Sequence, residues 1–530
     1  MMALRVACIG GGPGGLFVST LLKQTIPDAE VVLFERNQPA DAFGFGVVFS
    51  DATLRQINEA DPVVRDGLRN YGTHWDSIEV WLKNERKSFA GNGMAAIYRK
   101  TLLQLMQQRA AAVGVDTRFG QFVPDLSQLD DFDIIIGADG ANSSTREQLG
   151  ESLGHTVETA TAKFVWFGTT YKFSGLTFVH RQSEFGNFAV HGYPISDELS
   201  TFIVETDEQT WRKAGLDEFD VTQPPGTSDL KTQRFLEKLF AEDIAGEPLV
   251  ANNSRWANFR TRRTRTWHKG NVVLLGDAVH TAHFSVGSGT KMAMEDAITL
   301  VREINAHQDD LETAFTNYEA ERQPLVAKIQ KQAQGGLSWW EHFARYYNAF
   351  DPTQFTLHFF SRSIGVEKIR QRDPQLVASA EQNWLTHHGS SPLQTPLSAG
   401  PVRWEGRQLA LQQDAERTVL AGPGGQLPLV TEVTESDSGT GLLVSAPDTA
   451  EELPSSFAAL PEHAAAVIIR GGTPHTRTLL SEEARLGRGL TSIIVDDEGG
   501  VDAALTLILS GRADAVATAT ATAMSGAFHA

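Results

Sequence analysis

A glycine cluster near the N-terminus is the first group of residues whose spacing points to chemistry. Gly10, Gly12 and Gly15 have the G-x-G-x-x-G spacing, and Glu35 follows Gly15 by twenty residues. Glycines in this pattern allow a tight turn and let the backbone approach a pyrophosphate at the positive end of the next helix. A carboxylate at position 35 can bond both hydroxyls of a ribose. The pattern predicts a nucleotide site, and the acid favours a free ribose 2′-hydroxyl, as in FAD or NAD.

An Asp-Gly motif is the second group. Asp139 and Gly140 follow the apolar run 133–137, and Ser143 and Arg146 come soon after. Asp-Gly turns are common, so the dipeptide alone has the simpler explanation of a surface turn. Its place behind a buried strand, with the serine and arginine after it, favours a functional turn.

A third group begins with Gly276-Asp277 and leads to Gly287, Gly289 and Thr290, which open a predicted helix. An acid at this turn can bond the ribityl chain of a flavin. The helix N-terminus can hold the negative charge that develops at the flavin N1 and C2 carbonyl on reduction. Lys291 would add a cation that favours the reduced flavin, unless its side chain points away. A structural loop is the alternative, but the three motifs in this order favour a flavin site.

These motifs need a scaffold of alternating strands and helices. Residues 4–9 are predicted to form a buried strand, followed by a helix to about residue 24 and a second strand at 31–34. Helical periodicity dominates about 288–350, whereas about 160–210 has a strand pattern. The predicted fold class is α/β: a Rossmann-like FAD-binding domain with an inserted β-sheet substrate domain, a helical segment and a small C-terminal α/β appendage.

The predicted domain boundaries follow changes in pattern and composition. The FAD-binding domain is discontinuous, at 1–160 and 250–350, and the β-sheet substrate domain occupies 161–249. Residues 351–390 are a helical connection and linker. Residues 391–530 are a small C-terminal α/β domain.

Composition argues against several functional classes. The formal net charge of −19 argues against nucleic acid and anionic membranes as partners. No apolar run approaches the roughly 20 residues needed to span a bilayer. The single cysteine, Cys8, allows no internal disulfide, and an apolar strand begins too close to Met1 for a signal peptide. We expect a cytoplasmic protein that acts on a small molecule, with self-association left open.

The three motifs together resemble those of the single-component, FAD-dependent aromatic hydroxylases built like para-hydroxybenzoate hydroxylase. The resemblance implies that the first motif binds the ADP part of FAD. It implies that the Asp-Gly motif contacts FAD and is tied to NAD(P)H use, and that the Gly-Asp motif binds the ribityl and flavin end. Two positions depart from the usual family pattern, because Phe284 stands for a proline and Lys291 for an asparagine.

Five segments resemble a narrower branch, which includes salicylyl-CoA 5-hydroxylase, the monooxygenase half of 2-aminobenzoyl-CoA monooxygenase/reductase and the violacein-pathway hydroxylase. The segments are FGFGVVFSD (43–51), KFVWFGT (163–169), STFIVE (200–205), NNSRWANF (252–259) and HTAHFSVGSGTKMAMEDA (280–297). This likeness covers about residues 4–385. It implies that Arg99 lies near the FAD pyrophosphate and that Phe43–Val48 lies beside the isoalloxazine.

The motifs and the resemblance together predict one set of FAD-binding residues. They are Gly10, Gly12, Pro13, Gly14, Gly15, Glu35, Arg36, Phe45, Gly46, Val47, Arg99, Asp139, Asp277, Gly287, Gly289, Thr290 and Lys291. His191 and Tyr193 lie on the strand block expected over the substrate, and each is a candidate catalytic base for a phenol, with packing as the alternative. His280 and His283 lack a third ligand at suitable spacing, so no metal site is predicted.

The resemblance implies a hydroxylase in which NADH or NADPH reduces noncovalently bound FAD and oxygen adds at the flavin C4a. The hydroperoxide then hydroxylates an electron-rich ring such as a phenol, aniline or hydroxypyridine. The alternatives are an FAD-dependent oxidoreductase that does not hydroxylate and a redox-silent FAD-binding protein. Oxygen uptake matched by hydroxylated product would separate the first alternative, and failure of NAD(P)H to bleach the flavin would support the second. The expected partner is a small aromatic substrate, and a CoA thioester, a free aromatic and a natural-product intermediate all remain open.

The last 135 or so residues contain two stretches that resemble the flavin-binding barrel following the hydroxylase half of the bifunctional enzyme. SPLQTPLSAGPVRWEGR resembles the first segment of that barrel, and GGVDAALTLILSGRADAVATA resembles its last helix–strand unit. A complete eight-stranded barrel needs roughly 250 residues. A degenerate barrel relic is therefore one interpretation, and a thioredoxin-like tail is the other. In either case we expect no second flavin and no catalytic residue there.

Overall fold

The structure is a computed structural model in which the chain divides into two compact units. One unit comprises Met1–His342 and the other Phe343–Ala530. The structure describes residues 3–42, 44–50, 54–220, 222–223, 226–284, 287, 289–414, 417–432 and 439–519. The four-part domain division is finer than these two units and stays a prediction.

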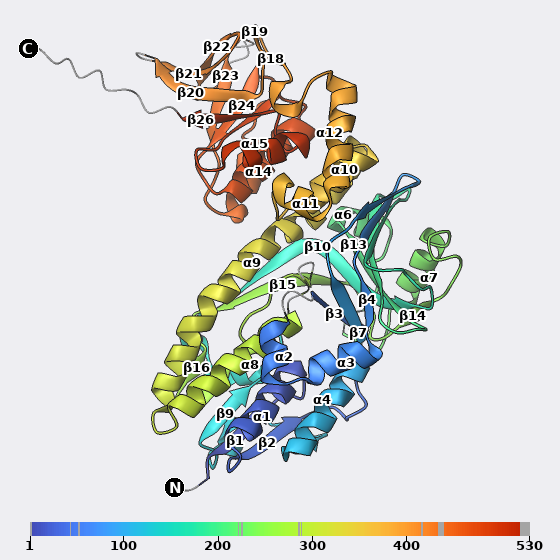
Figure 1. Cartoon of the computed structure of the whole chain (residues 1–530), viewed down its shortest axis with the longest axis vertical. Coiled ribbons are helices and arrows are strands. Elements are labelled where there is room, and N and C mark those ends of the chain that lie inside the picture. The colour runs from blue at the N-terminus through green and yellow to red at the C-terminus, as the bar shows by residue number, and fades with distance from the viewer. Residues whose placement is uncertain are drawn as a thin grey trace, which may run out of the picture. The chain divides into compact units, whose positions relative to one another are not determined.

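The first unit is built on a six-stranded sheet with the order β16-β17-β9-β1-β2-β8, in which only β16 runs antiparallel to its neighbour. Figure 1 labels β9, β1 and β2 of this sheet near the N-terminus. Short apolar runs buried on both faces form its central strands, as is typical of doubly wound sheets. The strands are β1 Arg5–Ile9, β2 Glu30–Glu35, β8 Asp116–Phe119, β9 Ile134–Gly137, β16 His268–Lys269 and β17 Val272–Leu274. This sheet confirms the Rossmann-like part of the predicted fold.

Three helices carry the motifs along this sheet: α1 (Pro13–Thr25), α4 (Arg99–Val113) and α8 (Gly289–Ala306). Helix α1 contacts both α4 and α8. A Cβ on Gly14 would lie 2.8 Å from Leu275 Cδ1, so a glycine lets the start of α1 approach the turn after β17. The first and third motifs are brought together by this packing.

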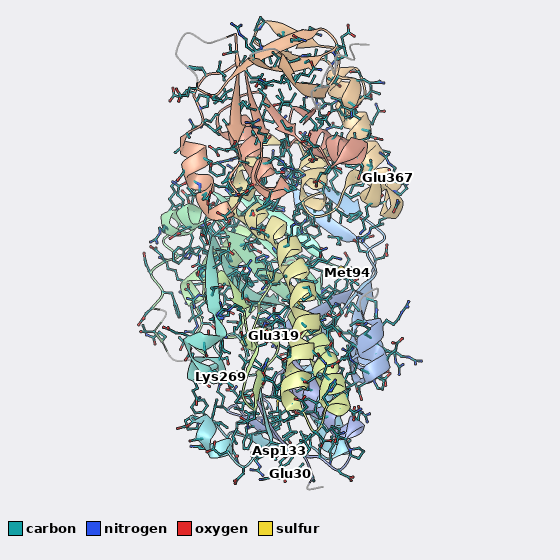
Figure 2. The ribbon with its side chains drawn as sticks, turned by 90° about the vertical axis from the view of Figure 1, so that its left-hand side faces the viewer. Glu30, Met94, Asp133, Lys269, Glu319 and Glu367 are labelled. Carbon is teal, nitrogen blue, oxygen red and sulfur yellow. The ribbon has the colours of Figure 1, made fainter. Side chains whose placement is uncertain are left out.

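The amino ends of the parallel strands are held by a separate polar cluster. The Arg5 backbone N–H donates to Asp133 Oδ2 at 2.7 Å, and Arg5 Nε lies 3.0 Å from Glu30 Oε2. Figure 2 shows Glu30 and Asp133 close together at this end of the unit. The nucleotide motifs follow the opposite, carboxyl ends of the strands, where ligands bind in such sheets.

A second, larger sheet has the order β14-β10-β13-β12-β11-β5-β6, with β15 paired to β10. Its strand pairs are antiparallel except β11–β5, which is parallel. Its strands are β5 Ile78–Leu82, β6 Glu85–Phe89, β10 His155–Thr169, β11 Thr177–Gln182, β12 Asn187–Pro194, β13 Ser200–Thr206, β14 Leu249–Ala251 and β15 Ala257–Thr264. One face forms an apolar core with residues of α6 (Glu208–Lys213) and α7 (Leu230–Leu239). Because side chains alternate along a strand, the other face presents a separate set of residues.

That other face packs against a small sheet with the order β3-β7-β4, namely β3 Gly46–Ser50, β7 Met94–Tyr98 and β4 Thr73–Trp75. The short helices α2 (Arg55–Ala60) and α3 (Val63–Tyr71) lie between β3 and β4 in the chain. A Cβ on Gly46 would overlap Ile195 and lie 3.0 Å from the Tyr193 ring. A glycine is therefore required where β3 crosses the large sheet.

A buried ionic network fixes the third motif to helix α9 (Leu311–Ala349), which begins in the first unit and ends in the second. Asp296, fully buried on α8, accepts hydrogen bonds from the Gly276 backbone and from Arg322 Nε on α9, at 3.0 and 2.8 Å. His280 Nε2 lies 2.7 Å from the same carboxylate. Burial acts to raise the pKa of Asp296, but His280 and Arg322 outweigh it and hold the pKa below its usual value.

The second unit contains a closed barrel of strands β20 to β26. The pairs β20–β21 and β21–β22 are antiparallel and the remaining pairs are parallel. The barrel strands are β20 Gln408–Asp414, β21 Arg417–Gly422, β22 Gly425–Val430, β23 Gly441–Ser445, β24 Ala466–Arg470, β25 Ser492–Val495 and β26 Ala515–Ala519. Strands β18 Leu397–Ala399 and β19 Val402–Trp404 form a separate pair before the barrel in the chain. The helices of this unit are α10 Pro352–Phe360, α11 Val366–Arg372, α12 Pro374–His388, α13 Leu453–Ala458, α14 Pro474–Glu482 and α15 Gly500–Leu509.

The predicted C-terminal α/β appendage is thus a small barrel rather than the open sheet of a thioredoxin-like tail. Side chains such as Leu420, Ile468 and Ile493 pack into one apolar cluster across its strands. No helix in the described part of the chain is long and apolar enough to cross a membrane.

Candidate functional site

The glycine loop between β1 and α1 has a backbone that only glycine allows at its first position. Gly10 has a φ of +114°, and its N–H donates to Phe34 O at 2.8 Å. A Cβ there would overlap the carbonyl of Ala138. Around Gly12, in contrast, no atom of the described residues beyond its chain neighbours lies within 4 Å of where a Cβ would be. The loop therefore leaves open space beside Gly12 at the N-terminus of α1, where a pyrophosphate can approach.

Glu35 ends β2 with both carboxylate oxygens oriented by neighbouring N–H groups. Oε2 accepts from the Gly11 backbone at 2.7 Å, and Oε1 accepts from the Asn37 backbone at 2.8 Å. A cavity opens beside it. The cavity is lined by Gly10, Gly11, Gly12, Glu35, Arg36, Arg99, Asp139, Gly140, Asn142 and further residues of the first unit. The first two motifs and Arg99 therefore line one cavity, and their binding of FAD stays a prediction.

Asp139 and Arg146 connect the second motif to the third. Asp139 Oδ2 accepts from the Thr145 backbone at 3.0 Å, whereas its Oδ1 is buried without a hydrogen-bond partner among the described residues. Ser143 Oγ caps α5 (Ser144–Leu149) by accepting from the Arg146 N–H at 2.9 Å. The Arg146 guanidinium then donates to Ala278 O at 2.7 Å. Oδ1 of Asp139 is an acceptor available to a ligand.

Asp277 is exposed to solvent, but other protein groups lie near its carboxyl. Loss of hydration raises the pKa of its carboxyl, while His280, Arg99 and Arg262 act in the opposite direction. A Cβ on Gly289 would lie 4.0 Å from Asp277 Oδ1, so the acid sits beside the first residue of α8. The carboxylate and this helix N-terminus therefore lie close together, and their contact with a flavin stays a prediction.

The segment around β3 is fixed from both sides. The ring of Phe45 packs against Gly168, where a Cβ would come within 2.6 Å of it. The N–H of Arg99 donates to Phe45 O at 2.7 Å, and Asn252 Nδ2 donates to Ala42 O at 3.1 Å. Gly46 and Val47 continue as the first residues of β3. Phe43, part of the same prediction, lies outside the described residues.

The described residues of the loop before α8 meet β3 as well. Gly287 has a φ of +59°, and a Cβ on it would lie 3.3 Å from Val48 Cγ1. Thr290 and Lys291 follow in the first turn of α8. Lys291 Nζ pairs with Glu295, whose other oxygen lies 3.2 Å from Arg322 Nη2. The carboxylate partly offsets the charge of this cation, and an effect of Lys291 on the flavin stays a prediction.

His191 is almost fully buried on the face of β12 that looks toward the third motif. Its Nε2 lies 3.0 Å from Glu205 Oε1 on β13, and its ring centre is 5.7 Å from that of Phe284. The Trp340 ring is closer, at 4.4 Å. A histidine beside a buried carboxylate can accept a proton, because the carboxylate stabilises the resulting imidazolium.

Tyr193, two residues further along β12, is also buried. Its hydroxyl donates to Gly46 O at 3.5 Å. Burial raises the pKa of Tyr193 well above its usual value, although Thr201 and Arg99 oppose the shift. Tyr193 therefore stays protonated at neutral pH and is suited to donate a hydrogen bond rather than to act as a base.

Four residues that the sequence analysis did not select belong to this region. Asn252 holds the backbone before Phe45, and Arg262 is buried beside Asn142 with its Nε unpartnered among the described residues. Trp75 and Trp166 each bury an indole N–H without an acceptor in the described part of the chain. The segments KFVWFGT and NNSRWANF contain Trp166 and Asn252, but the letters alone do not indicate these contacts.

The donor and acceptor set fits FAD. The free space at Gly12 matches a pyrophosphate, Glu35 matches a ribose diol, and Asp139 Oδ1 is a buried acceptor without a partner among the described residues. Arg99 supplies a cation at the same cavity, close enough to Asp277 for the two charges to interact.

Glu35→Ala is expected to raise the dissociation constant of FAD about ten-fold. The variant loses charge-assisted bonds to the ribose, and such bonds contribute about 1.5–3 kcal/mol each. Titration of apoprotein with FAD measures the effect. Glu30→Ala is the matched control, since Glu30 starts the same strand and pairs with Arg5 on the surface. Equal affinity in the Glu35 and Glu30 variants would contradict the assignment.

The chain is similar to known proteins both in sequence and in structure. A family model described as "FAD binding domain" matches residues 131–333. Salicyloyl-CoA 5-hydroxylase from a Streptomyces species is 53% identical over 522 residues, covering 97% of this chain and 99% of that protein. The 3-hydroxy-4-methyl-anthranilyl-[aryl-carrier protein] 5-monooxygenase of Streptosporangium sibiricum is 32% identical, covering 63% of this chain and 89% of that protein. The structure of 2-methyl-3-hydroxypyridine-5-carboxylic acid oxygenase superposes with a TM-score of 0.52 at 20% identity, over 69% of this chain and 99% of that one, which supports the fold.

Proposed function

The chain belongs to the family of single-component FAD-dependent aromatic hydroxylases, and from that premise we propose that it hydroxylates an aromatic acid bound as a thioester. The observation that carries this proposal is the 53% identity to salicyloyl-CoA 5-hydroxylase over nearly the full length of both chains. Use of FAD with NAD(P)H is common to the family. The thioester is the specific part of the proposal.

The names of two relatives describe the same kind of substrate. In both, an aromatic acyl group is attached to a carrier, which is CoA in one and an aryl-carrier protein in the other. A salicyloyl ring has a hydroxyl at carbon 2 and an anthranilyl ring has an amino group there. Carbon 5, the position hydroxylated by both, is para to that donor. We infer that this chain also adds oxygen para to a donor at carbon 2 of an aryl thioester, because the donor makes that carbon nucleophilic.

The FAD-binding set proposed here divides between two ends of the cofactor. The glycine loop and Glu35 hold the ADP part, while Asp277 and the start of α8 hold the ribityl chain and the flavin. When bound and reduced by NAD(P)H, FAD reacts with oxygen and supplies the oxygen atom that enters the ring. The chain contributes aromatic side chains around the substrate site, and these side chains exclude water from the reaction.

We propose that His191 accepts a proton from the substrate and that Tyr193 donates a hydrogen bond in the same site. His191 accepts the proton that the ring donor releases as the ring is oxidised, and Glu205 at 3.0 Å stabilises the resulting cation. Tyr193, whose hydroxyl stays protonated, donates a hydrogen bond in the same site.

The decisive experiment compares thioester and free acid with the purified FAD-loaded enzyme. Salicyloyl-CoA, 2-aminobenzoyl-CoA, salicylate and 2-aminobenzoate are each supplied with NADH or NADPH. Hydroxylated product is then measured by mass spectrometry with labelled oxygen. We expect coupled hydroxylation of a thioester and little product from the free acids. Efficient hydroxylation of a free acid, or of neither form, would overturn the proposed substrate class.

The same assay tests His191. His191→Asn should lower the rate of ring hydroxylation and change its pH profile while leaving FAD binding intact.

A free aromatic natural-product intermediate is the second candidate substrate. It is favoured by the 28% identity to protodeoxyviolaceinate monooxygenase of Chromobacterium violaceum, which covers 64% of this chain.

A further inference from the structure

Two tryptophans in the first unit bury hydrogen-bond donors that have no acceptor in the described part of the chain. Trp75 on β4 is only 9% exposed, and its Nε1 is unpartnered. Trp166 on β10 is partly exposed as a residue, but its Nε1 is buried and unpartnered as well. A buried donor without an acceptor forfeits its bonds to water, so each such group in a native structure needs an explanation.

Both indoles border the segment expected beside the flavin. The Trp75 ring centre lies 6.1 Å from that of Tyr193, whose hydroxyl donates to Gly46 O on β3. The two tryptophans belong to one apolar cluster that includes Phe45, Ile203 and Phe284.

Trp166 lies next to the third motif. Its ring centre is 6.2 Å from that of Phe284, in the third motif. Ser254 Oγ donates to Trp166 O at 2.6 Å, and the neighbouring Asn252 holds the backbone of Ala42 and Gly44. Trp166 is therefore fixed between the loop before β3 and the loop before α8.

We propose that the indole N–H groups of Trp75 and Trp166 are the donors that bind the oxygen acceptors of the aromatic substrate. The substrate ring would pack among the aromatic side chains of this cluster, while its acyl carbonyl and ring hydroxyl accept from the two indoles. A ligand acceptor at each position removes the cost of the orphaned donor. This inference rests on the proposed function, because it assigns the polar contacts of that substrate.

The chemistry of the donors also explains a preference for thioesters. An indole N–H is neutral and pairs well with a neutral carbonyl oxygen. A free carboxylate is hydrated far more strongly, and two neutral donors compensate poorly for the loss of that water. The cluster therefore discriminates by charge as well as by shape.

Trp75→Phe and Trp166→Phe test the inference, since phenylalanine keeps an aromatic ring and removes only the N–H and part of the ring. Binding of salicyloyl-CoA and of salicylate to the FAD-loaded proteins is measured by the change in flavin absorption, without turnover. We expect each variant to raise the dissociation constant of salicyloyl-CoA about ten-fold. FAD affinity and thermal unfolding should stay close to those of the wild type.

Trp211→Phe is the matched control. Trp211 on α6 also buries an unpartnered indole N–H among the described residues, but it belongs to the core on the other face of the sheet. Its substitution should leave ligand affinity unchanged. Unchanged salicyloyl-CoA affinity in either the Trp75 or the Trp166 variant, or an equal loss in the Trp211 variant, would overturn the inference.

Failure of the proposed function gives a different result. If the wild type binds salicylate and not salicyloyl-CoA, the thioester proposal is wrong, and the two tryptophans are then judged by their effect on salicylate. If the wild type binds neither compound, both the substrate class and the inference built on it fail.

Discussion

Gly12→Ala is expected to give a folded protein that no longer retains FAD. The backbone at Gly12 has φ −75° and ψ 178°, which alanine adopts without strain. In the described part of the chain, no atom beyond the neighbouring residues lies within 4 Å of the added Cβ. The methyl group would instead occupy the space proposed for the pyrophosphate. Crowding of this kind, with the loss of backbone hydrogen bonds to phosphate, should raise the dissociation constant of FAD about 100-fold.

Gly15→Ala provides the contrasting variant. A Cβ on Gly15 would overlap the carbonyl oxygen of Gly10, a backbone atom that cannot move without the loop. We expect a loss of about 3 kcal/mol of stability in the apoprotein in addition to lost FAD binding. Thermal unfolding of the apoproteins and FAD titration separate the two effects. A Gly12 variant that binds FAD normally, or that unfolds as easily as the Gly15 variant, would show that the open space has another purpose.

The nucleotide loops could be predicted because each is encoded within one short segment. The spacing of Gly10, Gly12 and Gly15 determines a turn and a helix start, and Glu35 follows at the end of the next strand. The structure places Gly10, Gly12 and Glu35 at one cavity with Asp139 and Arg99. To predict such a site, one needs only to assume that parallel strands end at the same edge of their sheet.

The substrate side could not be predicted in the same way. His191 gains its partner Glu205 from the neighbouring strand, and Tyr193 meets Gly46 from a different sheet. These contacts depend on strand register, which short alternating segments do not specify on their own. Trp166 has the appearance of a core residue in sequence, and only its surroundings in space reveal a donor without an acceptor in the described structure.

The barrel of the second unit could be predicted from the sequence only in part. Its two outer segments resembled parts of a larger barrel, but short strands of four to seven residues give no sign that a sheet closes. Closure depends on the pairing of the first strand, β20, with the last, β26. That pairing joins segments about 100 residues apart in the chain, from Gln408 to Val516, and local patterns do not report it.

Glu482→Gln is expected to destabilise the second unit by about 3 kcal/mol at neutral pH. Glu482 is 2% exposed, and its carboxylate lies 3.1 Å from His358 Nε2 and 3.5 Å from Arg512 Nε. It also accepts a hydrogen bond from the Tyr346 hydroxyl. Burial acts to raise the pKa of Glu482, but these three partners outweigh it and lower the pKa from about 4.5 to about 2. A shift of this size corresponds to a few kcal/mol.

The sign of the shift determines the pH dependence. Because the folded pKa is below the unfolded value, the stabilisation is complete above pH 4.5 and is lost as the pH falls toward 2. Hydrogen exchange of the full-length protein, followed in peptides from the barrel, should show lower protection in Glu482→Gln at pH 7 and a weaker dependence on acid. Glu367→Gln is the control, since Glu367 is 56% exposed and pairs with Arg370 on the surface (Figure 2). Equal protection in the two variants would mean that the buried carboxylate contributes no more than a surface pair.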